Sequence, residues 1–478
     1  MNKNGFSLKV GLFGIGLEAY WEQFEGLEKR LEGYLGLVAD KIKTFSCEVV
    51  NLGLIDNPEK AIVAGHDFRK ADVDIIFLYV TTYALSSTVL PVVQRAKVPV
   101  IILNLSPDAA IDYLALNKMT DRAKMTGEWL AYCSACPVPE IANVFKRAGI
   151  VFHQITGMLN NDIESWNEIE EWVDAANVAN IMFHNRMGAM GHYYSGMLDI
   201  YTDFTRQLAT FGGHIEIIEV DELSALRKNI DQLQIDDRVK YFRETFHVET
   251  DCSLEELERE ARTSVALDML VKKYNLGSLA YYYKGTGIGE NEDTMSSIIL
   301  GNSILTAQNV PVAGEYEIKN VQAMKILDSF DAGGSFSEFY ALDFKDDLVL
   351  MGHDGPGHLK IAEGKTKVRP LKVYHGKVGR GLSVEMVVKH GPVTLLSVVE
   401  TEDGKINFLI AEGESVAGPI LAIGNTNSRY RFSIGARKFV NDWNSHGPAH
   451  HCAIGVGHIA SKIKKLGDLI NVGSIIVC

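Results

Sequence analysis

The sequence lacks any apolar run close to the roughly 18 residues that a membrane-spanning helix needs. Its most apolar stretch, residues 73–80, has a length that suits a buried strand. Six cysteines in 478 residues are too few for a disulfide scaffold of this size. We therefore expect a reduced, cytoplasmic protein with no membrane partner.

Basic residues are also in short supply. The chain has 47 Lys and Arg against 61 Asp and Glu, for a formal net charge of −14. Nucleic-acid binding requires a basic face, so this balance argues against a nucleic-acid partner. The glycine-rich segments 11–16 and 285–289 both miss the GxGxxG spacing of dinucleotide-binding turns. We expect neither NAD nor ATP as a cofactor.

The chain does have enough apolar residues, 46% of the total, for several folded domains. Its first third alternates apolar runs with segments of helical spacing, which predicts a parallel sheet covered by helices. The runs are 8–15, 73–83 and 98–105, and the helical segments are 18–35 and 86–96.

A helix predicted over about 161–185 leads into a second α/β region. This region has strand-like runs at 214–220 and 278–283 and a highly charged helical stretch between them, 221–275. After about residue 330 the pattern changes to short strands punctuated by glycine and proline. Hairpin-turn signals at 390–392 and 402–404 predict an antiparallel sheet or a small barrel.

Histidine is concentrated at the end of the chain, with eight of 14 after residue 350. His450 and His451 are adjacent, and neighbouring side chains on an extended segment face opposite ways. We therefore expect only one of the two to point into a given site. Glu315 and Glu338 each lie in a glycine-containing segment, and His353 ends an apolar strand. Carboxylates combined with imidazoles suit Mn²⁺ or Mg²⁺ better than a thiolate-preferring ion.

Four separated segments together resemble the metal-site motifs of the L-arabinose isomerase family, in the same order. They are Ala-Gly-Glu at 313–315, Gly-Gly-Ser-Phe-Ser-Glu at 333–338, the strand 348–353, and Ala-His-His at 449–451. That family shares a superfamily with the L-fucose isomerases. The resemblance implies an α/β chain with two doubly wound, Rossmann- or flavodoxin-like domains at 1–170 and 171–327. A C-terminal antiparallel β-barrel-like domain would follow at 328–478.

The resemblance also implies a metal site. Its ligands would be Glu315, Glu338, His353 and His451, holding Mn²⁺ with Co²⁺ or Mg²⁺ as alternatives. Two glutamates and two histidines are typical of arabinose isomerases, whereas fucose isomerases use Glu, Asp and a single late His.

The implied activity is aldose–ketose isomerisation, an intramolecular oxidoreduction of an open-chain pentose such as L-arabinose. Protons would move through a metal-stabilised enediolate, with Glu315 and Glu338 as the catalytic base and acid. A hydride shift stays open as an alternative. The expected sugar contacts are His450, Tyr83 and His192.

The resemblance implies a homo-oligomer, a hexamer, with each site shared between subunits. Two departures from the family pattern leave the sugar open: Tyr316–Glu317–Ile318 replaces Gly-Asp-Trp, and polar residues follow His353. The alternatives are an L-fucose-isomerase-like enzyme acting on a deoxy or modified aldose, and a non-catalytic sugar-binding protein.

Overall fold

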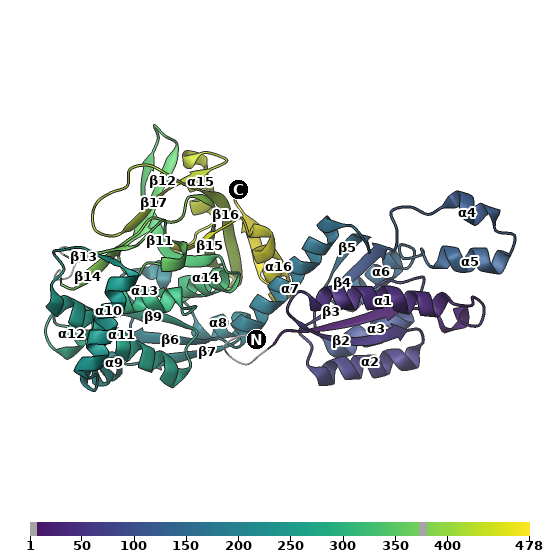
Figure 1. The fold of residues 1–478 in the computed structure, drawn as a ribbon, viewed down its shortest axis with the longest axis horizontal. Helices are drawn as coiled ribbons and strands as arrows, with labels where there is room; N and C mark the ends of the chain where they lie inside the picture. Colours follow the sequence, from purple (N-terminus) through teal and green to yellow (C-terminus); the bar gives the residue numbers. More distant parts are fainter. Residues whose placement is uncertain (1–6, 372–379) are drawn as a thin grey trace. The chain divides into compact units, whose positions relative to one another are not determined.

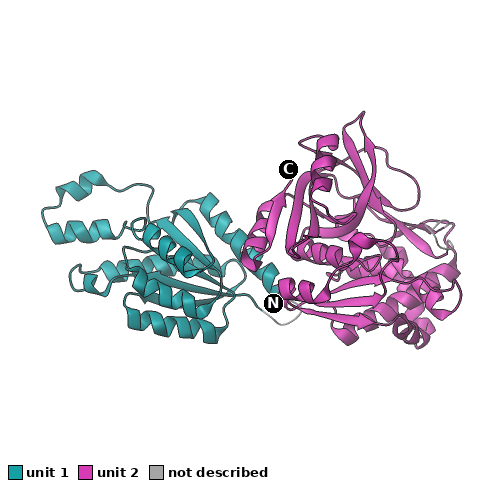
Figure 2. Cartoon of the chain, turned by 180° about the vertical axis from the view of Figure 1, so that it is seen from behind, with its two compact units in different colours: residues 1–180 teal, residues 181–478 magenta. Residues whose placement is uncertain are grey.

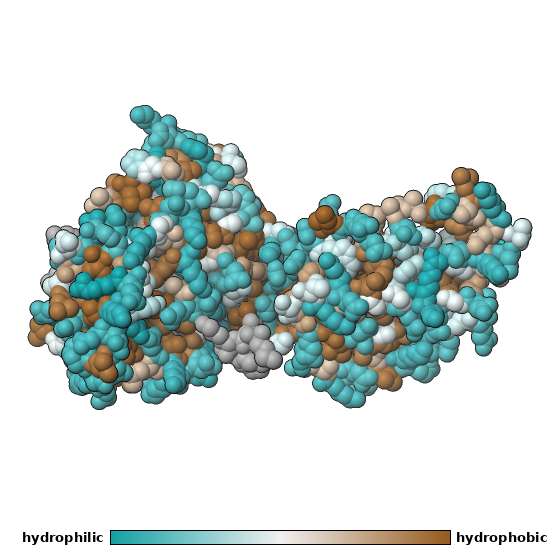
Figure 3. Space-filling view, in the orientation of Figure 1, coloured by the Kyte–Doolittle hydropathy of each residue, from teal (hydrophilic) through white to brown (hydrophobic). Residues whose placement is uncertain are grey.

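The computed structural model describes residues 7–371 and 380–478. The chain divides into two compact units, Met1–Asn180 (unit 1) and Ile181–Cys478 (unit 2), which Figure 2 shows in separate colours. Among the described helices, none combines the length and apolar character that a bilayer crossing requires. Figure 3 shows hydrophobic residues scattered among hydrophilic ones on one face of each unit.

Unit 1 contains a five-stranded parallel sheet, sheet A, in the order β2-β1-β3-β4-β5 (Figure 1). This order is that of a flavodoxin-like winding. The strands are β1 (Lys9–Ile15), β2 (Glu48–Ile55), β3 (Ile75–Tyr79), β4 (Val100–Ser106) and β5 (Phe152–Met158). The helices are η1 (Glu18–Tyr20), α1 (Leu27–Lys43), α2 (Pro58–Ala71), α3 (Ser86–Ala96), α4 (Tyr113–Lys118), α5 (Arg122–Leu130), α6 (Val138–Ala148) and α7 (Ile163–Phe183).

The core of unit 1 follows from its apolar runs. Every residue of β3 is buried, as expected for a central strand of a parallel sheet. Phe68 of α2, Val89 of α3 and Phe145 of α6 lie in one hydrophobic cluster with side chains of β3 and β4. Helix α2 begins where the Asn57 side chain accepts a hydrogen bond from the Lys60 amide, a normal N-cap.

Unit 2 begins with a second parallel sheet, sheet B, in the order β10-β9-β6-β7. When these four strands are numbered in chain order and read from β7, their order is 2-1-3-4. The first four strands of sheet A have the same order. The strands are β6 (Arg186–Gly191), β7 (His214–Ile218), β9 (Ser278–Tyr282) and β10 (Val312–Ala313). The helices are η2 (Leu198–Ile200), α8 (Phe204–Phe211), α9 (Val220–Lys228), α10 (Gln232–Thr245), α11 (Leu254–Tyr274), α12 (Glu290–Met295), α13 (Ile299–Ala307) and α14 (Ile318–Ser329).

The rest of unit 2 is a seven-stranded sheet, sheet D, and a small sheet, sheet C. Sheet D has the order β15-β18-β11-β12-β17-β16-β19, and β15 also pairs with β16. All its pairings are antiparallel except that of β16 with β19. Its strands are β11 (Gly333–Asp343), β12 (Leu348–His353), β15 (Gly391–Glu400), β16 (Ile406–Val416), β17 (Thr426–Phe432), β18 (His451–Val456) and β19 (Gly473–Ile476). Sheet C joins β8 (His247–Val248), β13 (Lys367–Pro370) and β14 (Leu382–Glu385). The last helices are η3 (Leu359–Ile361), α15 (Ala436–Ser445) and α16 (Ala460–Ile470).

Helix α14 links the two large sheets of unit 2. It contacts β9 and β10 of sheet B, and β11, β15 and β18 of sheet D. All of its residues from Ile318 to Asp328 are buried, including Lys319 and Lys325. Because the chain runs from β10 through α14 into β11, the segments on either side of the helix are held firmly beside both sheets.

The predicted mixed α/β class is confirmed, with parallel sheets first and a mainly antiparallel sheet last. The hairpin turn predicted at 402–404 joins β15 to β16. The hairpin turn predicted at 390–392 is wrong. Gly391 and Pro392 are the first residues of β15, and the preceding strand β14 pairs with β13 in another sheet. Proline is tolerated at the start of a strand, so its presence did not require a turn.

Candidate metal centre

Three neighbouring strands of sheet D bring together residues that are distant in the sequence. The central strand β11 pairs with β18 on one side, which puts Glu338 opposite His451. It pairs with β12 on the other side, which puts Glu338 opposite Gly352, the residue before His353. The antiparallel register therefore places Glu338 opposite one histidine and diagonal to the residue position of the other.

Glu315 enters the same cluster from sheet B. It follows β10 and lies at the carboxyl end of this sheet, where doubly wound folds bind their ligands. Glu315 and Tyr316 both have left-handed backbone conformations, with φ of 57° and 62°. Consecutive left-handed residues with long side chains are strained, a feature that concentrates at functional sites. The Tyr316 amide donates to the Tyr281 carbonyl at 3.0 Å, which ties this turn to the end of β9.

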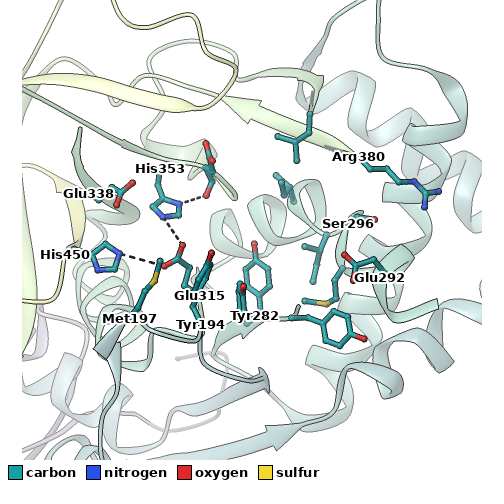
Figure 4. A pocket seen from close by; sticks show the side chains of 18 residues that line it. Tyr194, Met197, Tyr282, Glu292, Ser296, Glu315, Glu338, His353, Arg380 and His450 are labelled. Atoms are coloured by element: carbon teal, nitrogen blue, oxygen red, sulfur yellow. Dashed lines mark hydrogen bonds and ion pairs between the residues drawn. The ribbon is translucent and has the colours of Figure 1, made fainter. Parts of the chain in front are cut away.

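The side chains converge on a small volume (Figure 4). In two overlapping groups, each residue offers a ligand atom within 4.8 Å of the others: Glu315, His450 and His451, and Glu338, His353 and His451. His451 Nε2 lies 3.4 Å from Glu315 Oε2, and His353 Nε2 lies 4.0 Å from Glu315 Oε1. These separations exceed hydrogen-bond lengths.

Two further carboxylates contact the Nδ1 atoms of the two adjacent histidines, His450 and His451. Glu317 Oε2 lies 2.6 Å from His451 Nδ1, and both side chains are completely buried. Asp199 Oδ2 lies 2.6 Å from His450 Nδ1 and also accepts from the His450 amide at 2.9 Å. A proton held on Nδ1 of His451 leaves the lone pair of Nε2 facing Glu315, which is the arrangement found behind metal-bound histidines.

Burial dominates the protonation behaviour of the cluster. It raises the pKa of Glu315 to about 7, although the nearby His450 acts in the opposite direction. Burial also raises the pKa of Glu317 to about 8. It lowers the pKa values of His353 and His451 below the ordinary histidine value, so both imidazoles are neutral at pH 7. Neutral imidazoles are the form that binds metal ions.

The residues present fit a divalent cation. Glu315 Oε2 and His451 Nε2 are buried, and neither has a hydrogen-bond partner among the described residues. Buried polar atoms without partners are rare and costly, and facing lone pairs would be satisfied by a cation. With metal–ligand bonds of about 2.0–2.2 Å, adjacent ligand atoms in an octahedral shell lie about 3 Å apart. The observed 3.4 Å separation is close to that value.

A cavity of about 220 Å³ opens beside the cluster. Glu315, Glu338, His353 and His450 line it at one end, and Tyr194 and Tyr282 line its middle (Figure 4). Its remaining walls come from the segment after β9 and from residues near the ends of sheet C, among them Glu292, Met295, Ser296, Ile299, Leu371 and Arg380. Tyrosine rings suit a small-molecule pocket because they offer an apolar face and a hydrogen-bonding tip.

The orientation of His450 and His451 differs from the one that we predicted from the sequence. Both rings lie beside the cluster, with centroids 3.8 Å apart and both Nε2 atoms within 3.8 Å of Glu315 Oε2. The prediction that only one of them can point into a site is wrong. His450 precedes β18 and lies in a bend, so the alternation of side chains along a strand does not apply to it.

The other two expected sugar contacts lie elsewhere. His192 is exposed after β6, and its ring packs edge-on against Tyr282, a residue that lines the cavity. Tyr83 belongs to unit 1, where its hydroxyl donates to Glu140 at 3.5 Å. Both assignments stay predictions.

Sequence reasoning missed Glu317 and Asp199. Glu317 had a signal, since it is a second carboxylate two positions after Glu315. Asp199 had none, because it lies 251 positions from His450, in the short helix η2, which no sequence pattern distinguishes.

No family model and no curated protein matches this chain. Among solved structures, the chain is similar to the D-lactate dehydrogenase of Escherichia coli at 12% identity, with 68% of this chain and 94% of that chain covered and a TM-score of 0.15. It is similar to the Salmonella D-lactate dehydrogenase at 9% identity, with 68% and 95% covered and a TM-score of 0.15. Similarities this low carry no argument about fold or activity.

Proposed function

We propose that this protein is a divalent-metal-dependent aldose–ketose isomerase that acts on an open-chain pentose such as L-arabinose or a related sugar. The observation that carries the proposal is that Glu315, Glu338 and His353 line one end of one cavity, and that buried His451 belongs to both groups of candidate ligand atoms. These residues come from four separate segments, and the same four are the ligands implied by the resemblance to arabinose isomerases. Mn²⁺ is the proposed ion, with Co²⁺ or Mg²⁺ as alternatives.

The chemistry of the cluster suits this reaction. A bound divalent cation would supply Lewis-acid polarisation of the sugar carbonyl. Glu315 and Glu338 are the proposed acid and base that exchange protons with the first two carbons and their oxygens. His450, held by Asp199, is proposed to hydrogen-bond a sugar hydroxyl.

The architecture proposed for the whole molecule is the three-domain one, with boundaries near residues 170 and 327. For the C-terminal domain, a barrel-like form is supported by the double pairing of β15 with β18 and β16, which returns the strand order to its starting strand. We also propose a hexamer with shared sites, in which Tyr83 of one subunit and His192 contact the sugar.

The test is a metal-dependence assay on a panel of aldoses. The purified protein is stripped with a chelator, dialysed, and assayed for ketose formation with Mn²⁺, Co²⁺, Mg²⁺ or no metal added. We expect no turnover without metal and restoration by Mn²⁺. The variants Glu338→Gln and His353→Gln should lose activity and Mn²⁺ binding, whereas His446→Gln, at an exposed position, should retain both. Full turnover after complete chelation, or no ketose from any aldose with Mn²⁺ bound, would contradict the proposal.

A further inference from the structure

The cavity beside the metal cluster has a second end whose chemistry differs from the first. Figure 4 shows Glu292, Ser296 and Arg380 on the wall opposite Glu338, His353 and His450, with Tyr194 and Tyr282 between them. In the proposed function, the reacting end of the sugar lies at the cluster. The distal end of the same open chain would then extend toward Glu292.

Glu292 brings an unsatisfied acceptor to this distal end. It lies in the short helix α12, which follows the loop after β9. Its Oε2 atom is buried and has no hydrogen-bond partner among the described residues, although the side chain lines the cavity. A buried carboxylate oxygen without a donor is costly to the folded protein, and a ligand that supplies the donor recovers this cost.

Arg380 does not neutralise Glu292. Its guanidinium lies 3.0 Å from Asp293 Oδ1 and 4.0 Å from Glu256 Oε1, two carboxylates that also pair with Arg227 or Arg259. A methyl group at the distal end of the ligand would leave Glu292 Oε2 without a donor.

We propose that Glu292 determines specificity by accepting a hydrogen bond from a distal hydroxyl of the open-chain sugar. The preferred substrates are then aldoses that are hydroxylated at the distal end, rather than terminal-deoxy sugars. This inference rests on the proposed function and narrows its substrate class.

The test compares each aldose with its terminal-deoxy counterpart in the full-length, Mn²⁺-loaded protein. We expect the wild-type protein to favour the hydroxylated sugar in kcat/KM by roughly 10- to 100-fold, the ratio expected for one unpaired buried polar group. Glu292→Leu should lose most of this preference through a higher KM for the hydroxylated sugar. Glu292→Gln, whose amide oxygen still accepts a hydrogen bond, should retain part of it.

The matched control is Glu290→Gln in the same helix. Glu290 pairs with Lys228 at 2.7 Å and does not line the cavity, so its variant should keep the wild-type preference. Circular dichroism checks that each variant is folded. Equal preference in the wild-type protein and both Glu292 variants would overturn the role of Glu292 and leave the isomerase proposal standing.

A second measurement does not require turnover. Calorimetric titration with open-chain alditols, with and without the terminal hydroxyl, should show weaker binding of the deoxy alditol to wild-type protein and no such difference in Glu292→Leu. A wild-type protein that neither isomerises an aldose nor binds an alditol would overturn the proposed function, and the role of Glu292 with it.

Discussion

The buried His358 should lower the free energy of unfolding at acidic pH, and replacing it with leucine should remove this effect. The side chain is completely buried, and neither ring nitrogen has a hydrogen-bond partner among the described residues. Burial lowers the pKa of His358 from 6.5 to about 4. The folded state therefore holds a neutral ring, whereas the unfolded chain protonates near pH 6.5.

The size of the effect follows from these two pKa values. At 1.36 kcal/mol per pKa unit, this difference makes the free energy of unfolding about 3 kcal/mol lower at a pH below both pKa values than at a pH above both. Because the folded-state pKa is the lower one, this contribution is complete above about pH 6.5 and is lost as the pH falls toward 4. Lowering the pH from 8 to 5 should remove about 2 kcal/mol of it.

Hydrogen exchange of peptides from β11 and β12 measures this change locally, because His358 Nε2 lies beside Gly333, the first residue of β11. Comparing His358→Leu with the wild-type protein at each pH cancels the intrinsic pH dependence of exchange. In metal-free protein, we expect the variant to gain about 2 kcal/mol of protection relative to wild type between pH 8 and pH 5. His446→Leu, at an exposed position, should gain none. A constant difference between His358→Leu and wild type across this range would refute the reasoning.

Three other predictions concern the centre and its support. Glu317→Gln should weaken Mn²⁺ binding roughly 10- to 100-fold in a calorimetric titration, because an amide is a weaker partner for His451 Nδ1 than a carboxyl group and orients the ring less well. Gly352→Ala should destabilise sheet D by about 1–3 kcal/mol in thermal unfolding, since the added Cβ would clash with the Thr426 carbonyl oxygen. Phe439→Ala should cost about 3–5 kcal/mol in urea unfolding, because this buried ring stacks on Phe432 and lies in the core of sheet D.

Local elements of the first unit could be read from the sequence, because each depends on a short pattern. The helix predicted at 86–96 is α3, and the run at 98–105 contains most of β4. The helix predicted at 18–35 begins later, at Leu27, since Gly26 takes a left-handed conformation with φ of 82° and ends the preceding turn. Order within a sheet could not be read, because pairings such as β15 with β18 depend on contacts between distant segments.

Residues of the candidate centre could be predicted only where a sequence motif contains them. His353 ends a strand that the apolar pattern marks, so its position at the end of β12 follows from the sequence. Glu338 was identified only by its motif, because the polar, glycine-rich start of β11 has no apolar strand pattern. The left-handed turn at Glu315 and the salt bridge between Asp199 and His450 arise from tertiary packing, which no local pattern encodes. Glu292 is similar, because its importance depends on the cavity that the folded chain encloses.

The position of β18 sets the order in which this molecule can be assembled during synthesis. This strand lies between β15 and β11, although it is made after both of them. Until it emerges, β11 and β15 each present an unpaired edge, a surface on which nascent chains aggregate. At 5–20 residues per second, the interval between synthesis of His353 and of His451 is roughly 5–20 s. The last histidine of the cluster thus arrives on the strand that closes the gap in the sheet, and chains released before this point would be candidates for chaperone capture.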